Sequence, residues 1–289
     1  MSRLVEQSIT IFKAMENIRN DKYVMPAFQR QYVWSMEQVE KLWDSILLDY
    51  PIATFLFWHV DKNNTEKDTY FCQFLQDVTF NSRKQADSVS YELASIDLSK
   101  TNTAVLDGQQ RLTSLFLSLF GNSFIRQKYA RTRKNGGIVA SLLIELNKNK
   151  LSVDEDEFNS KKHDIIFSDK IGKKSPTQFE IKRIIDEKFR NDNTRDDAIE
   201  DAIKYVPANC KQYARDLLNK LYRKVFVEKL VRYTEIFEMG QDDALEMFVR
   251  FNAGGKPLRK SDITMSILEA YWPSAKTEFG KLLQGSYNG

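Results

Sequence analysis

The stretch VLDGQQRLTSLF, residues 105–116, indicates how the centre of the chain folds, because an apolar strand pattern passes there into an apolar helix pattern. Residues 103–106 predict a strand. After the turn, apolar residues recur at the i, i+3, i+4, i+7 and i+8 positions of a helix with one core-facing side. These residues are Leu112, Leu115, Phe116, Leu119 and Phe120. We therefore expect a strand, a turn at Asp107 and Gly108, and a buried helix.

The turn itself predicts a capped helix N-terminus. Asp107 is expected at the N-cap, and Gln110, three positions on, is expected to complete a capping box. Gly108 lets another group come close to the backbone. Free N–H groups, the positive end of the helix dipole and the guanidinium of Arg111 together suit phosphate oxygens. A carboxylate repels an anion unless Mg²⁺ or a sugar hydroxyl lies between them, so the turn predicts either such a phosphate site or a well-capped core helix.

A second polar cluster is PAFQRQYVW, residues 26–34, between a strand predicted at 23–25 and a helix that begins after Ser35. Gln29 and Arg30 are presented on this loop, where functional groups are more often found than inside helices or strands. Tyr32 and Trp34 could stack on a base. Packing beneath the loop is the favoured interpretation for both rings, because large aromatic residues dominate protein cores.

A third cluster is FVRFNAGGKPLRKSD, residues 248–262, where a helix predicted over 242–251 ends at Asn252 and a glycine pair. The glycines permit positive φ and close backbone approach. Lys256 follows at once, but the next residue is proline, so the segment does not match a phosphate-binding P-loop. The alternative is two helices joined by a glycine turn.

The remaining pattern predicts two regions with a boundary near residue 150. Residues 1–150 begin with a short helix and contain most of the strand patterns, whereas residues 151–289 are mainly charged and helix-forming. Ser35 and Gln38 predict a capping box. Further strands are expected at 52–60, 69–75, 90–96 and 138–146, an extended segment at 225–237, and helices at 210–224 and 261–271.

The composition predicts a globular protein in a reducing compartment. The 289 residues, 42% of them hydrophobic, suffice for one large or two modest domains. A formal net charge of +3 is too small for nucleic-acid binding through bulk charge, so any such contact must be local. Cys72 and Cys210 lack the spacing of a zinc site or a disulfide scaffold. There is no signal-peptide pattern and no apolar run of about 18 residues, so we expect a cytoplasmic protein without membrane contact.

Taken in this order, the three motifs resemble the signature of the GmrSD-type family, specifically its N-terminal NTPase module. The resemblance implies an α+β fold class, with a ParB/sulfiredoxin-like mixed α/β domain over residues 1–150 and a mostly helical region over 151–289. It implies that three residues act in catalysis: Asp107, Gln110 and Arg111. It implies a nucleotide-binding set of Gln29, Arg30, Tyr32, Gly108, Gln109, Asn252 and Lys256. Asp107 would also position Mg²⁺ or water.

The resemblance further implies that NTP hydrolysis is coupled to the cleavage of modified phage DNA in bacterial defence. GTP, UTP, ATP and CTP are all candidate substrates. An HNH-type nuclease, as a further domain or a separate subunit, would be a partner, because His59 and His163 lie far apart and lack the context of a nuclease site. Homodimer formation is left open.

The alternative hypothesis is a ParB-like switch that binds nucleotide and DNA without efficient turnover. Its DNA contacts would lie in RQKYARTRKNGG, residues 126–137. The basic residues expected to contact DNA phosphates there are Arg126, Lys128, Arg131, Arg133 and Lys134. A solvated basic loop would have the same sequence pattern. A scaffold in which the motifs only pack is the third interpretation.

Overall fold

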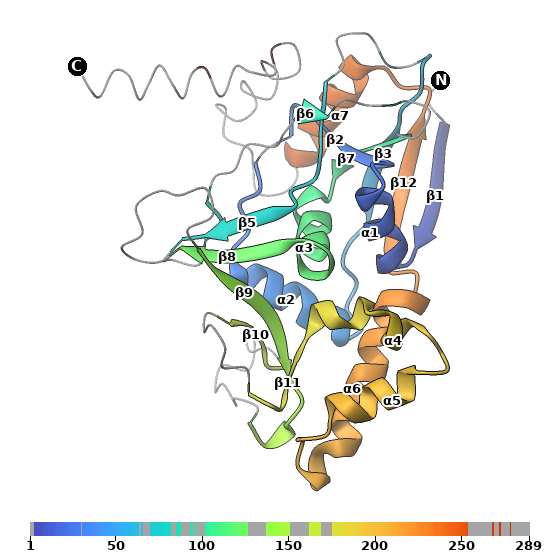
Figure 1. Ribbon diagram of the computed structural model, residues 1–289. Coiled ribbons are helices and arrows are strands. Elements are labelled where there is room, and N and C mark those ends of the chain that lie inside the picture. The colour runs from blue at the N-terminus through green and yellow to red at the C-terminus, as the bar shows by residue number, and fades with distance from the viewer. Residues whose placement is uncertain are drawn as a thin grey trace, which may run out of the picture.

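The computed structural model has a mixed α/β architecture (Figure 1). It describes residues 3–29, 31–63, 65, 70–81, 85–87, 93–94, 97, 102–126, 137–150, 162–168, 175–253, 268, 272 and 278. Its α-helices are α1 (Ile11–Arg19), α2 (Met36–Leu47), α3 (Gln109–Leu119), α4 (Glu187–Arg190), α5 (Arg195–Ala202), α6 (Lys211–Tyr222) and α7 (Gln241–Ala253). Shorter helical turns are η1 (Lys148–Lys150), η2 (Ile181–Ile185), η3 (Ala208–Cys210) and the π-helix η4 (Arg223–Val227).

The larger sheet joins strands from both ends of the described chain. In spatial order they are β1 (Arg3–Ile9), β12 (Val231–Phe237), β3 (Phe55–His59), β7 (Thr103–Asp107), β2 (Tyr23–Pro26), β4 (Phe71–Cys72) and β6 (Leu93–Ala94). β3 runs parallel to β12 and β7 runs parallel to β2, whereas the other neighbours are antiparallel. β7, which carries the central motif, is therefore an interior strand.

The second sheet lies on the other side of α3 (Figure 1). Its strands are β10 (Ile165–Ser168), β9 (Gly137–Glu145), β8 (Asn122–Arg126) and β5 (Asp77–Phe80), and β11 (Gln178–Glu180) also pairs with β9. β8 continues directly from the C-terminal end of α3. The chain thus runs from an interior strand of one sheet, through α3, into the other sheet.

The interior strands β3 and β7 of the larger sheet are buried on both faces, because successive side chains of a strand point to opposite sides. On one face, Phe57 and Val105 pack against α1 and α3. On the other face, Leu56 and Leu106 pack against α7. Every residue of α3 except Arg111 is buried. The central helix is therefore a core element on all sides, and Arg111 is the one position where it reaches toward solvent.

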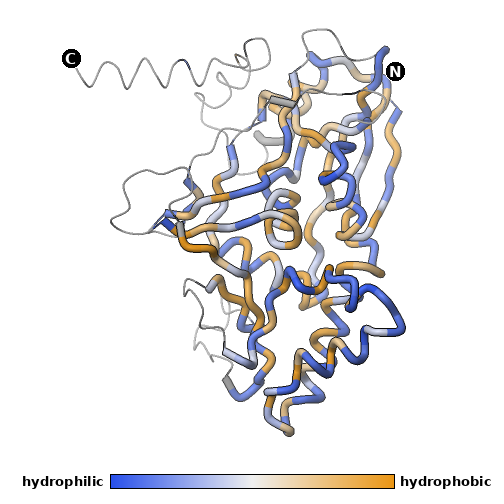
Figure 2. Tube along the Cα trace, viewed as in Figure 1, coloured by the Kyte–Doolittle hydropathy of each residue, from blue (hydrophilic) through white to orange (hydrophobic). Residues whose placement is uncertain are grey.

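Most of the predicted elements are confirmed. The helix after Ser35 has the predicted capping box, in which Ser35 Oγ accepts from Gln38 N and Gln38 Oε1 accepts from Ser35 N. The predicted helices correspond to α1, α6 and α7, and the predicted strands to β2, β3, β4, β6, β7 and β9. Hydrophobic residues recur at helical spacing between hydrophilic residues along α6, as expected for a helix with one buried face (Figure 2). The helix predicted at 261–271 falls almost wholly outside the described residues.

Several elements were not predicted. β1, β5 and β8 contain polar or charged residues that weaken a strand pattern in the sequence, and they are stabilised by pairing with distant strands. The prediction of one extended segment over 225–237 was wrong at its start, because η4 occupies Arg223–Val227 and only β12 is a strand. Among the described residues, no helix has the length and apolar character needed to span a bilayer.

Both sheets take strands from each side of residue 150. β12 inserts between β1 and β3, and β10 and β11 extend the second sheet along β9. The described part of residues 151–289 therefore contains strands as well as helices. The mixed α/β class is confirmed, and the ParB-like fold remains an expectation from the resemblance.

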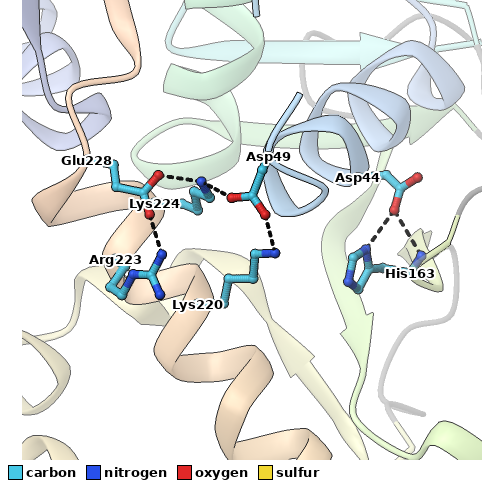
Figure 3. Close-up of polar contacts among 7 residues, drawn as sticks. All are labelled: Asp44, Asp49, His163, Lys220, Arg223, Lys224 and Glu228. Atoms are coloured by element: carbon cyan, nitrogen blue, oxygen red, sulfur yellow. Dashed lines mark hydrogen bonds and ion pairs between the residues drawn. The ribbon is translucent and has the colours of Figure 1, made fainter. Parts of the chain in front are cut away.

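One buried hydrogen-bonded pair, Asp44 and His163, ties α2 to the segment just before β10 (Figure 3). Asp44 is buried in α2, and its Oδ1 lies 2.8 Å from His163 Nδ1, while the backbone N–H groups of Lys162 and His163 also donate to its carboxylate. Burial acts to raise the pKa of Asp44, but the hydrogen bonds from His163 and Lys162 outweigh it, so the pKa lies below the ordinary value of 3.8.

We expect Asp44→Asn to reduce the acid sensitivity of folding. Because the folded-state pKa is lowered, ionised Asp44 stabilises the fold above about pH 4, and this contribution is lost as the pH falls through the folded-state pKa. The variant should lose about 1.5–3 kcal/mol of unfolding free energy at pH 7, which is the scale of hydrogen bonds to a charged group. Urea titrations between pH 7 and pH 3 measure this, with the exposed Asp216→Asn as control. Parallel pH profiles for wild type and Asp44→Asn would contradict it.

Candidate functional site

The turn between β7 and α3, residues Asp107 to Arg111, forms the candidate site. Asp107 is the last residue of β7, and the N-cap of α3 is Gly108, with φ of 93° and no side-chain cap. The prediction that Asp107 caps the helix and forms a capping box with Gln110 was therefore wrong. Asp107 is one residue too early, because it still pairs with Leu56 of β3 as part of the sheet. The residue at the N-cap position of α3 consequently has no side chain that could accept from the first N–H groups.

Gly108 is required at this position for two reasons. Its φ lies in the left-handed region, which L-residues with a side chain rarely adopt. A Cβ at this position would also lie 2.1 Å from Phe55 Cδ1. The glycine thus allows the ring of Phe55 to pack directly against the turn.

The side chain of Gln29 donates hydrogen bonds to the backbone of β7 at a β-bulge next to the turn. The pairing of β3 with β7 shifts register here, since Leu56 faces Asp107 whereas Phe57 faces Val105. Gln29 is buried, and its Nε2 donates to the carbonyl oxygens of Val105 at 3.1 Å and Leu106 at 2.9 Å. The amide therefore bonds backbone acceptors beyond the last pair of the β2–β7 ladder. Bulges of this kind are frequent beside active sites.

Gln110 and Tyr32 hold the loop of the second motif against α3. Gln110 Oε1 accepts from Val33 N at 2.9 Å, and Gln110 Nε2 donates to Gln31 O at 3.0 Å. Tyr32 is fully buried, its hydroxyl lies 2.8 Å from Ser114 Oγ, and burial raises its pKa. The ring of Tyr32 therefore packs in the core, which is the interpretation that the sequence favoured for the aromatic residues of this loop. The first two motifs are thus joined by side-chain amides.

Arg111 is fixed on three sides. Its Nη2 donates to Asp107 Oδ2 at 3.1 Å, its Nη1 donates to the carbonyl oxygen of Ile52, and its guanidinium carbon lies 4.6 Å from the ring centre of Phe55. Burial lowers the pKa of Arg111 and the charge of Asp107 opposes this, but an arginine stays charged in proteins. The side chains of Arg111 and Asp107 are 18% and 41% exposed, so the pair is accessible at the end of an otherwise buried helix.

The structure brings together most of the predicted site residues that it describes. Gln29, Tyr32 and the residues of the β7–α3 turn, including the buried Gln109, lie together. Asn252 is in the last turn of α7, one turn beyond Phe248, whose ring centre lies 5.3 Å from that of Phe28 in the second motif. The other predicted residues lie outside the described part: Arg30, Lys256, Arg131, Arg133 and Lys134.

Sequence reasoning missed two groups that shape the site. Phe55 stacks on Arg111 and fills the space above Gly108, and the carbonyl of Ile52 accepts from Arg111. The sequence indicates only a buried strand at 52–60, with no functional motif. Their role arises from the antiparallel pairing of β3 with β7, which is a contact between segments about fifty residues apart.

These features define a mixed α/β protein with a polar site at the N-terminus of a central, buried helix. All three motifs lie within one family match. The chain belongs to the family described as the GmrSD restriction endonuclease, N-terminal domain, whose profile matches residues 11–269. This confirms the resemblance stated from the motifs.

A relative with a partial match is an uncharacterized protein of Methanocaldococcus jannaschii. The two sequences are 33% identical over 100 residues, which is 35% of this chain and 15% of that protein. The chain therefore spans a small part of that relative's length.

Proposed function

We propose that the chain binds a nucleoside triphosphate at the β7–α3 turn, hydrolyses it, and couples hydrolysis to sensing or cleavage of modified phage DNA. Family membership supports the restriction-system context. The observation that carries the nucleotide-binding part is the N-terminus of α3, which has no side-chain cap and lies between the carboxylate of Asp107 and the guanidinium of Arg111.

A phosphate fits this N-terminus electrostatically. The first N–H groups of a helix have no intrahelical acceptor, and the helix dipole adds a partial positive charge there. Arg111 lies in the first turn and supplies a full positive charge. A phosphate that reaches Arg111 must compete with Asp107, but a partly exposed ion pair contributes only about 0–1 kcal/mol. A phosphate at this position would accept from the backbone N–H groups of α3 as well as from Arg111, and these additional bonds favour the exchange.

Asp107 fits a Mg²⁺ ion that arrives with the nucleotide. Mg²⁺ in nucleotide sites is commonly held by one or two carboxylates, waters and the substrate phosphates. Among the described residues, no group of three or more His, Cys, Asp or Glu side chains could hold a metal. One partly exposed carboxylate therefore suits a nucleotide-bound ion better than a permanent protein cage. When bound, Mg²⁺ would neutralise phosphate charge and remove the repulsion between Asp107 and the anion.

The side chains of the site then fall into two groups, those that would contact the nucleotide or its ion and those that hold the motifs in place. Arg111 would stabilise charge on the transferring phosphoryl group, and Asp107 would orient the ion or the attacking water. Both polar atoms of the Gln110 side chain bond the loop, and Gln29 Nε2 bonds β7. We therefore assign these two glutamines to holding the motifs together. The resemblance further implies an HNH-type nuclease, as a domain or subunit, as the partner that acts on DNA.

We expect Asp107→Asn to lower phosphate release at least tenfold with every NTP that the wild-type chain hydrolyses. The substitution keeps the shape of the side chain but removes the charge that attracts Mg²⁺. The measurement is phosphate release by the purified chain with GTP, UTP, ATP or CTP and Mg²⁺, with and without modified phage DNA. Asp77→Asn is the matched control, because Asp77 is an exposed aspartate at the start of β5, in the other sheet.

Two results would count against hydrolysis at this turn. Equal turnover by wild type and Asp107→Asn would remove Asp107 from the site. Nucleotide binding by the wild-type chain without phosphate release would favour the alternative, a ParB-like switch that binds nucleotide and DNA.

A further inference from the structure

The loop that joins α2 to β3, residues 49–54, is held in an unusual conformation. Two of its residues that are not glycine, Asp49 and Ala53, have φ of 65° and 64°. Such left-handed residues are energetically unfavourable and persist where the surrounding structure fixes them. The contacts at the two ends of this loop show what fixes it.

At its start, the loop is held by two lysines from the second half of the chain (Figure 3). Asp49 Oδ2 lies 2.6 Å from Lys220 Nζ in α6, and Asp49 Oδ1 lies 2.5 Å from Lys224 Nζ in η4. The side chain of Lys224 is only 2% exposed, and its Nζ also contacts Glu228. Burial acts to lower the pKa of Lys224, but these two carboxylates outweigh it and raise the pKa above 10.5.

The other end of the loop is held by the candidate site. The carbonyl oxygen of Ile52 accepts from Arg111 Nη1, and Phe55, the first residue after the loop, lies beneath the guanidinium. Of the three contacts that hold this guanidinium, two come from residues 52–55, and the third comes from Asp107. Asp49 precedes Ile52 by three residues, so a displacement of Asp49 is transmitted over at most about 11 Å of chain.

We infer that Asp49 is a positioning residue for Arg111 and acts through the loop of residues 49–55. The inference rests on the proposed function, because it gives the loop a role in nucleotide hydrolysis. Catalytic groups must be held close to their productive geometry, and a misplacement of about 1 Å can cost on the order of a hundredfold in rate. Residues of α6 and η4, which lie outside the three motifs, would thereby set the efficiency of the site.

The first test is the steady-state kinetics of Asp49→Asn. Asparagine tolerates the left-handed conformation and keeps the side-chain shape, but it removes the charge that binds the two lysines. We expect kcat for NTP hydrolysis to fall about tenfold. KM should change less than about twofold, because the N-terminus of α3 can still bind the phosphates in the variant. Asp192→Asn is the matched control, since Asp192 is exposed and its partner Arg195 lies in α5.

A second variant should give a smaller loss of kcat, and it keeps the inference testable if Asp49→Asn does not fold. Lys220→Met removes one lysine partner of Asp49 and leaves the contact with Lys224 intact. We expect kcat to fall about twofold to threefold. An unchanged kcat in both variants, or a change in KM alone, would overturn the positioning role.

A spectroscopic measurement separates this inference from the proposed function. The ¹⁵N side-chain resonances of Arg111, assigned by their loss in Arg111→Lys, report the position of the guanidinium without any substrate. We expect Asp49→Asn to shift them and Asp192→Asn to leave them in place. If the wild-type chain hydrolyses no NTP but the shift occurs, the proposed function fails and the positioning stands. If hydrolysis occurs but Asp49→Asn changes neither kcat nor the resonances, the positioning fails and the proposed function stands.

Discussion

Gly108→Ala is expected to lower the free energy of unfolding by about 2–5 kcal/mol and to disrupt the candidate site. A left-handed residue with a Cβ costs about 1–2 kcal/mol more than glycine. Insertion of a methyl group into a filled space adds about 1–3 kcal/mol, and here the new Cβ would lie 2.1 Å from Phe55 Cδ1. Relief of the clash must move Phe55 or the turn, and Arg111 contacts both.

The measurement is urea unfolding of wild type, Gly108→Ala and Gly240→Ala. Gly240 is a matched control, because an added Cβ there would meet no atom within 4 Å and its φ is not in the left-handed range. We expect Gly240→Ala to stay within about 0.5 kcal/mol of wild type. A loss in Gly108→Ala no larger than in Gly240→Ala would show that the turn adapts without strain.

The elements that sequence reasoning predicted well are those whose signal is local. The strand, turn and helix of residues 105–116 follow from a change in apolar period, and the capping box at Ser35 follows from residues three positions apart. The family assignment likewise follows from short motifs. For such features the physical cause lies within one or two helical turns of the residues that show it.

The errors arise where a distant segment decides the local structure. Aspartate is a better N-cap than glycine, so Asp107 is the sound choice from the sequence alone. Pairing with Leu56 keeps Asp107 in β7, and contact with Phe55 requires Gly108 in the next position. The same holds for Gln29, whose amide bonds β7 at a bulge that no local pattern predicts.

The double variant Asp49→Asn/Glu228→Gln is expected to be less stable than the sum of its single variants predicts. Each single substitution leaves Lys224 one carboxylate partner, and the partly exposed partner that remains limits the loss to about 1 kcal/mol. The double substitution leaves the buried ammonium of Lys224 without either of the two carboxylates that it contacts in the wild-type chain. Such an unpaired charge costs about 3–5 kcal/mol. The double-mutant cycle of wild type, the two single variants and the double variant should therefore show a coupling free energy of about 1–3 kcal/mol.

The pH dependence of the unfolding free energy gives an independent test of the same double-mutant cycle. In the wild-type chain the pKa of Lys224 is raised, so its contribution to stability is fully present below the unfolded-state pKa and is lost only as the pH rises through the folded-state value, above 10.5. In the double variant, burial without a partner should lower the folded-state pKa of Lys224. The variant should then recover unfolding free energy as the pH rises from 7 to 9.5, whereas the wild-type contribution of Lys224 stays constant over that range. Urea midpoints of all four proteins at both pH values measure this. Additive losses without recovery at pH 9.5 would mean that Lys224 reaches solvent when its partners are removed.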